Sequence, residues 1–161
     1  RSGVGRVSNN ANTTELIGTA SEGREAKPYL YRVSASDWLA DHDLQEEVFG
    51  PLGIVVEAQD VTQMAEIARS IQGQLTCTIH MDDCDSDHAK TLMPLIERKA
   101  GRILINGFPT GVEVADSMVH GGPYPASTNF GATSVGTLSI RRFLRPVCYQ
   151  NAPDNLLPQD F

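Results

Sequence analysis

The sequence predicts an α/β fold: a three-layer structure with helices flanking a parallel sheet. Three apolar strand patterns alternate with two amphipathic helical patterns between residues 53 and 106. Each crossover helix must return the chain to the same strand direction, so this β-α-β-α-β order favours a parallel sheet with right-handed crossovers. The 161 residues and the 40% hydrophobic composition are sufficient for one compact domain with its own core.

The chain before this regular part predicts two strands and one helical turn. Residues 15–17 form a short β-like run inside a polar opening stretch that ends near Lys27 and is poorly suited to fold alone. Residues 28–35, PYLYRVSA, alternate large apolar and polar side chains, which indicates a strand. Ser36 and Asp37 would then cap one helical turn.

The first repeat of the regular part begins with residues 53–58, GIVVEA, a continuous apolar strand pattern. Asp60 would cap the following helix, because its carboxylate can accept hydrogen bonds from the first free backbone N–H groups. Apolar residues then recur at helical intervals as far as Ile71. Residues 74–81, QLTCTIHM, indicate the second strand.

The second repeat predicts a helix that begins at Ser86 or Asp87. Pro94 would bend this helix, because proline donates no backbone hydrogen bond. Gly101 would end it, as glycine commonly does at helix C-termini. The third strand would follow over residues 102–106, RILIN.

A loop of more than twenty-five residues, rich in glycine and proline, follows Asn106. A loop of this length is usually functional or held by a partner, and we expect it to pack over the carboxyl ends of the parallel strands. Ser134 would cap a short helix after it. Pro146 cannot donate a ladder hydrogen bond, so residues 143–149 are expected to form an edge strand or to pair outside their own domain.

Composition argues against nucleic-acid and membrane partners. The chain carries 13 Lys and Arg against 20 Asp and Glu, and its formal net charge is −7. The basic cluster of Arg141, Arg142 and Arg145 lacks interleaved aromatic residues for base stacking. No apolar run approaches the ~18 residues that span a bilayer. Three irregularly spaced cysteines fit reduced thiols, so we expect a cytoplasmic location.

The stretch HMDDCDSDH, residues 80–88, combines metal-ligating residue types. A calcium loop would also need a glycine and a bidentate glutamate at fixed positions that this stretch does not supply. A zinc site formed by His80, Cys84 and His88 matches no standard ligand spacing, and an acidic turn before a helix explains the same residues. A standalone, non-enzymatic α/β module that binds metal through these three residues is the alternative function.

Cysteine catalysis has little support in this sequence. Cys84 lies among aspartates, whose negative charge disfavours the thiolate, and Cys77 lies between apolar neighbours inside a predicted strand. Cys148 lies in the terminal extended segment. None of the three has an evident activating partner, so we predict no catalytic residue in this chain.

Three stretches together resemble the C-terminal part of the aldehyde dehydrogenase superfamily. They are EEVFGP at residues 46–51, AGRILIN at residues 100–106 and a downstream Gly-Gly loop. The stretches INGFPTGVEVADSMVHGGPYPAS and LRPVCYQN are most similar to the branch of alpha-ketoglutaric semialdehyde dehydrogenases and NADP-dependent fatty aldehyde dehydrogenases. The resemblance implies oxidation of an aldehyde, such as 2-oxoglutarate semialdehyde, to a carboxylic acid with NADP or NAD.

The resemblance also implies roles for individual residues. Glu47 would accept hydrogen bonds from the nicotinamide ribose hydroxyls, and Phe49 would pack near the nicotinamide. Phe108, Thr110 and His120 would line the substrate tunnel. His120 replaces the aromatic residue that is usual before Gly-Gly, which changes the expected polarity of that wall.

The resemblance implies a homo-oligomer that pairs through Phe143 to Tyr149. It also implies that the catalytic cysteine, the general-base glutamate and the Rossmann domain lie in a missing upstream part, so that the isolated chain is inactive. A reductase acting on acyl phosphates or thioesters is a third possibility within the same superfamily. The expected division is 1–28 continuing from the upstream part, 29–133 the α/β catalytic-domain portion, 134–150 the short helix and oligomerisation strand, and 151–161 the tail.

Overall fold

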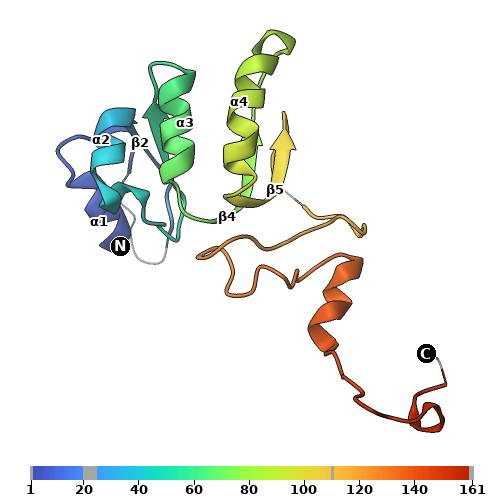
Figure 1. Ribbon diagram of the computed structural model, residues 1–161. Coiled ribbons are helices and arrows are strands. Elements are labelled where there is room, and N and C mark those ends of the chain that lie inside the picture. Colours follow the sequence, from blue (N-terminus) through green and yellow to red (C-terminus); the bar gives the residue numbers. More distant parts are fainter. Residues whose placement is uncertain (1, 20–24, 110, 160–161) are drawn as a thin grey trace.

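The computed structural model describes residues 2–19, 25–109 and 111–159. Helices and strands alternate through most of this range (Figure 1). In chain order the elements are α1 (Ser2–Ser8), β1 (Thr14–Ile17), β2 (Tyr29–Ser34), α2 (Ala35–Ala40), the 3-10 helix η1 (His42–Gln45), β3 (Leu52–Glu57), α3 (Val61–Ser70), β4 (Gln74–Ile79), η2 (Asp83–Asp85), α4 (Ser86–Ile96), β5 (Ala100–Ile105), η3 (Thr137–Phe143) and η4 (Asp154–Leu156).

The strands form two sheets, and most strand pairs are parallel. In the first sheet, β2 lies between β1, which is antiparallel to it, and β3, which is parallel to it from Tyr29↔Leu52 to Ser34↔Glu57. In the second sheet, β4 and β5 are parallel. The α/β class with parallel strands and flanking helices is confirmed. The expected single sheet is not seen: within the described residues, β3 pairs with β2 and β4 pairs with β5, but β3 and β4 do not pair with each other.

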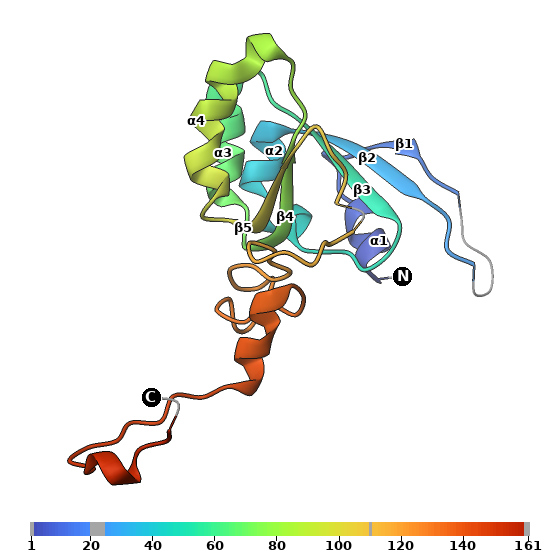
Figure 2. The ribbon, with the colours of Figure 1, turned by 90° about the vertical axis from the view of Figure 1, so that its right-hand side faces the viewer.

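The helices α2, α3 and α4 lie together on one side of the strands (Figure 2). Helix α3 packs against both α2 and α4, and so connects the helical layer across the two sheets. The predicted cap of α3 is confirmed, since Gln63 N donates to Asp60 Oδ1 at 2.8 Å. Among the described residues, no helix has the length and apolar character needed to cross a membrane.

Helix α4 begins at Ser86, as predicted, whereas the predicted start of α2 lies two residues from the observed one. Helix α2 begins after Ser34, whose Oγ accepts a hydrogen bond from Asp37 N at 3.1 Å, so Ser36 is already inside the helix. Helix α4 follows the short η2 turn, in which Asp82 N donates to Asp85 Oδ2 at 3.0 Å. The capping box of Asp82 and Asp85 belongs to η2, and Asp85 makes no side-chain cap hydrogen bond to α4.

The predicted role of Gly101 is also wrong. Helix α4 ends at Ile96, and Gly101 lies inside β5. A glycine is needed at this position of β5 because the Gly-Gly loop, described below, approaches its backbone closely.

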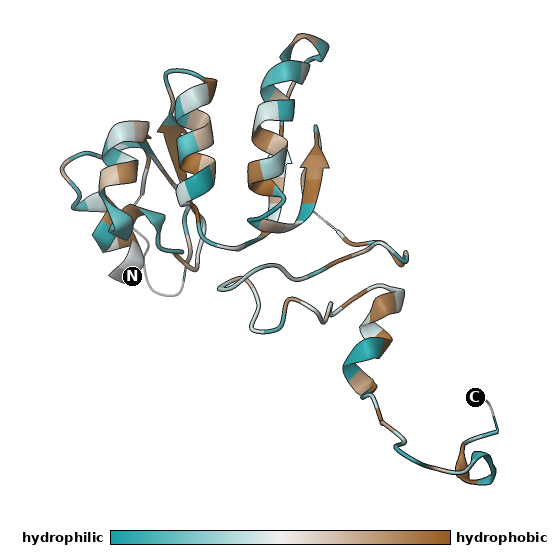
Figure 3. Ribbon diagram, in the orientation of Figure 1, coloured by the Kyte–Doolittle hydropathy of each residue, from teal (hydrophilic) through white to brown (hydrophobic). Residues whose placement is uncertain are grey.

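The main hydrophobic core belongs to the first sheet and its helices. Tyr31 and Val33 of β2 are almost fully buried, together with Trp38 of α2, Leu44 of η1 and Val7 of α1. In Figure 3 the second sheet shows a strongly apolar β5. Helix α1 was not predicted, because its sequence SGVGRVS has low helix propensity, and the burial of Val7 against the core holds it in place.

The C-terminal part leaves the sheets and extends away from them (Figure 1). Its short helix η3 is preceded by Gly136 at φ 84°, and not by the predicted cap Ser134, whose Oγ instead donates to His120 O at 3.2 Å. Residues 144–149 are extended and form no strand within the described part of the chain.

Candidate functional site

The segment of residues 46–51 connects η1 to β3 and is held at both ends. At its start, Arg6 Nη2 of α1 donates to the carbonyl oxygen of Glu46 at 3.1 Å. At its end, Tyr29 N of β2 donates to the carbonyl oxygen of Pro51 at 2.8 Å. Between these anchors, the side chain of Val48 packs against the core. The sequence therefore presents a short, fixed segment immediately before a parallel strand.

This segment is exposed except at Val48. Glu47 is exposed, Val48 is half-buried, and Phe49 is 92% exposed. Glu47 and Phe49 are therefore both open to solvent, on either side of Val48 in the sequence. A carboxylate can accept hydrogen bonds from two neighbouring hydroxyl groups, and an exposed aromatic ring provides an apolar wall beside it.

Gly50 sets the end of this exposed pair. Its φ of 152° is a backbone conformation that residues with a Cβ rarely adopt. Its carbonyl oxygen accepts a hydrogen bond from Leu52 N at 2.8 Å, so the chain turns at Gly50 and enters β3 directly. The glycine lets Phe49 project outward instead of following the strand.

The Gly-Gly loop lies at the amino-terminal ends of β4 and β5. An added Cβ on Gly122 would lie 2.2 Å from the carbonyl oxygen of Gln74, the first residue of β4. One on Gly101 would lie 1.9 Å from the carbonyl oxygen of Gly121. The expectation that this part of the loop covers the carboxyl ends is therefore wrong, because the chain runs back past β5 before it reaches the two glycines.

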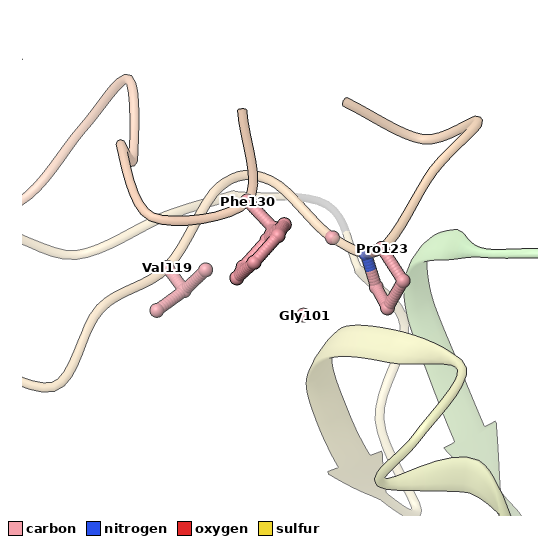
Figure 4. A pocket seen from close by; sticks show the side chains of 5 residues that line it. Gly101, Val119, Pro123 and Phe130 are labelled. Carbon is pink, nitrogen blue, oxygen red and sulfur yellow. The ribbon is translucent and has the colours of Figure 1, made fainter. Parts of the chain in front are cut away.

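An apolar cavity of about 340 Å³ lies where this loop meets β5. Figure 4 shows the ring of Phe130 between Val119 and Pro123, above Gly101. The sequence analysis did not identify these lining residues. The dense glycine and proline pattern indicated an important loop, but it contained no signal for which side chains the loop would bring together.

The carboxyl ends of β4 and β5 are joined by Asn106. Its side-chain amide forms two hydrogen bonds with the backbone of Met81, as a neighbouring strand would: Asn106 Nδ2 donates to Met81 O at 2.8 Å, and Met81 N donates to Asn106 Oδ1 at 2.7 Å. Asn106 also adopts φ 52°, which turns the chain sharply. After this turn, the ring of Phe108 lies 5.2 Å from that of His80, measured between centroids.

The predicted wall residues are not gathered at one place. Phe108 follows the carboxyl end of β5, whereas His120 adjoins Gly121 at the amino end, about 13 Å away along the strand. Two hydroxyl residues hold the backbone of His120: its N–H donates to Thr133 Oγ1 at 2.9 Å, and its carbonyl accepts from Ser134 Oγ. Thr110 lies outside the described residues.

The described residues support neither a metal site nor an activated cysteine. Within residues 2–19, 25–109 and 111–159, no three His, Cys, Asp or Glu side chains are grouped as metal ligands, so His80, Cys84 and His88 do not converge. Burial raises the pKa of Cys77, which disfavours its thiolate.

Sequence comparisons relate this chain to named enzymes, although no profile of a known protein family matches it. The chain is 53% identical over 130 residues to alpha-ketoglutaric semialdehyde dehydrogenase 2 of Azospirillum brasilense, covering 81% of this chain and 25% of that protein. It is 52% identical over 135 residues to alpha-ketoglutaric semialdehyde dehydrogenase of Acinetobacter baylyi, covering 83% of this chain and 26% of that protein. The chain thus spans about a quarter of the length of these curated relatives.

Solved structures share the fold at low identity. The Delta-pyrroline-5-carboxylate dehydrogenase of Mycobacterium tuberculosis matches with a TM-score of 0.66 and 19% identity, over 98% of this chain and 30% of that chain. Betaine aldehyde dehydrogenase of Staphylococcus aureus matches with a TM-score of 0.64 and 17% identity, over 88% of this chain and 28% of that chain. The chain is therefore similar in sequence to part of two alpha-ketoglutaric semialdehyde dehydrogenases and shares the fold of part of these aldehyde dehydrogenase structures.

Proposed function

We propose that this chain forms part of an NAD(P)-dependent aldehyde dehydrogenase and supplies its clamp for the nicotinamide ribose. The exposed pair of Glu47 and Phe49, in a segment anchored at both ends, carries this proposal. Glu47 would accept hydrogen bonds from the two ribose hydroxyls, and Phe49 would limit the movement of the nicotinamide ring. The nicotinamide, when bound, accepts the hydride removed from the substrate.

The residues present fit such a ligand. The carboxylate of Glu47 has no hydrogen-bond or ion-pair partner among the described residues, so it is free to accept from a diol. Phe49 is exposed beside it and loses little packing when a ring system covers it. Orientation matters here because hydride transfer requires the two reacting carbons to be held close and aligned.

Glu47→Gln in the complete polypeptide that carries this sequence tests the clamp. The amide keeps the shape of the side chain but removes the charge, which weakens hydrogen bonds from the ribose. We expect the Kd for NAD(P)+ to rise about tenfold. Glu46→Gln is the matched control, since Glu46 is an equally exposed neighbouring carboxylate that contributes its backbone carbonyl to the Arg6 bond. Equal Kd values for both variants would refute the clamp.

The proposed substrate is 2-oxoglutarate semialdehyde, which would be oxidised to a dicarboxylate. Its support is the 53% and 52% identity to two alpha-ketoglutaric semialdehyde dehydrogenases. A purified complete enzyme should show a higher kcat/KM for this semialdehyde than for an uncharged aldehyde of equal length. Phe108, Thr110 and His120 remain predicted wall residues, and residues 29–133 the predicted catalytic-domain portion.

The proposal includes a homo-oligomer that pairs through residues 143–149. Phe143, the last residue of η3, is 84% exposed, and Leu144 and Val147 of the extended part are 65% and 55% exposed. Pairing with another chain would bury this apolar surface. We also propose that the 161 residues alone are inactive, because none of the three cysteines has an activating partner in the described structure.

The three cysteines are free thiols, which supports a cytoplasmic location.

A further inference from the structure

We propose that Arg6 is a positioning residue for Glu47, and this inference rests on the proposed ribose clamp. Arg6 lies in α1, a helix that no sequence motif connects with the clamp. Its Nη2 donates to the carbonyl oxygen of Glu46 at 3.1 Å, across 40 residues of sequence. The contact therefore ties the start of the chain to the segment that carries the proposed clamp.

The hydrogen bond acts on the peptide unit that leads into Glu47. The carbonyl of Glu46 and the N–H of Glu47 lie in one rigid plane, so fixing the carbonyl also fixes the direction in which the Glu47 backbone starts. The bond uses the backbone and leaves the Glu47 carboxylate free. Arg6 thus influences where the carboxylate points without occupying it.

A second contact from the same helix acts on the other side of Glu47. An added Cβ on Gly3 would lie 2.9 Å from Cγ1 of Val48, so the glycine allows α1 to press directly on the Val48 side chain. Val7, on the same helix, is 1% exposed within the core. Helix α1 therefore holds the residues before and after Glu47, while Val7 fixes the helix itself.

The environment of Arg6 argues for a specific role. Its Nε is buried and has no hydrogen-bond partner among the described residues. Burying an unpaired polar atom is unfavourable, so such atoms in native proteins usually accompany another requirement. We infer that the requirement here is the hydrogen bond from the same guanidinium to the Glu46 carbonyl.

A double-mutant cycle in the complete polypeptide tests this inference. The Kd for NAD(P)+ is measured for the wild type, Arg6→Ala, Glu47→Gln and the double variant. We expect Arg6→Ala to raise the Kd about fivefold in the wild-type background and to leave it unchanged when Glu47 is already glutamine. Arg6→Lys should bring the Kd to within about twofold of wild type, because one ammonium N–H can replace the bond.

Hydrogen exchange provides a readout that does not depend on the cofactor. In the ligand-free protein, the amides of Glu47 and Val48 should exchange faster in Arg6→Ala than in wild type. Arg32→Ala is the matched control: Arg32 is an exposed arginine of β2, paired with Glu57 at 3.8 Å, and its removal should change neither the exchange of these amides nor the Kd.

The outcomes separate the inference from the proposed function. If Glu47→Gln raises the Kd but Arg6→Ala does not, or if Arg6→Ala raises it equally in both backgrounds, the positioning role is overturned and the clamp stands. If Glu47→Gln has no effect, the clamp itself is overturned, and the inference fails with it. A loss of thermal stability in Arg6→Ala with unchanged exchange at Glu47 also contradicts a positioning role.

Discussion

Gly101→Ala tests the observed course of the Gly-Gly loop. The carbonyl oxygen of Gly121 lies 1.9 Å from the position of the added Cβ, and Cβ contacts below 3.0 Å are essentially never seen. The oxygen must therefore retreat by about 1 Å. The oxygen is a backbone atom and the position of the added Cβ is fixed by the backbone of residue 101, so no side-chain rotation relieves the collision.

The cost follows from how the loop is held. Ser127 Oγ donates to the Gly122 carbonyl at 2.6 Å and accepts from Gly122 N at 3.3 Å, so a displaced loop strains both bonds. Overpacking of this kind costs about 1 to 3 kcal/mol. The structure allows the loop to detach as a unit, so the free energy of local opening should fall by that amount while the sheets stay folded.

Native-state hydrogen exchange of residues 119–127 measures this local free energy. The matched control is Gly111→Ala in the same loop, where no heavy atom lies within 4 Å of the added Cβ. The control should stay within about 0.5 kcal/mol of wild type. A folded Gly101→Ala protein whose loop amides exchange as slowly as those of the control would show that the glycines do not cross the strand ends as described.

The remaining predictions concern a turn and a tyrosine. Asn106→Ala loses both hydrogen bonds to Met81 and keeps the φ of 52°, so it should lower the free energy of unfolding by about 2 kcal/mol, measured in urea. Asn106→Gly loses the same hydrogen bonds but relieves the backbone strain, so its loss of unfolding free energy should be smaller. A larger loss for Asn106→Gly than for Asn106→Ala would contradict this reasoning. Burial, followed by the hydrogen bond to Glu15, raises the pKa of Tyr31 above its ordinary 10.0. The folded state keeps the phenol proton longer, so stability present below pH 10 is lost as the pH rises through the folded pKa. When the pH is raised from about 9 to about 11, the unfolding free energy of Tyr31→Phe should therefore fall by less than that of the wild type. An equal fall in both proteins would show that Tyr31 does not titrate in this way.

Local patterns predicted most of the regular elements. The alternation in residues 28–35 marked β2, and Asp60 marked the start of α3, because both signals depend on neighbouring residues alone. Long-range features were missed for the opposite reason. The two-sheet arrangement depends on which strands pair, and α1 is stable through the burial of Val7 rather than through its own propensity.

The resemblance named Glu47 and Phe49 as site residues, and their role stays a prediction; both are exposed in the anchored segment. It gave no indication of Arg6, since a hydrogen bond across 40 residues leaves no local pattern. The approach of Gly101 to Gly121 was missed likewise, because the sequence shows that glycines are present but not which backbone they allow to come close.

A crystal structure of the complete polypeptide with bound NAD(P)+ tests the central proposal most directly. The account predicts that the Glu47 carboxylate lies within about 3.2 Å of the nicotinamide ribose hydroxyls, with the Phe49 ring against the nicotinamide end. A structure in which other groups hold these hydroxyls and Glu47 faces solvent would contradict it.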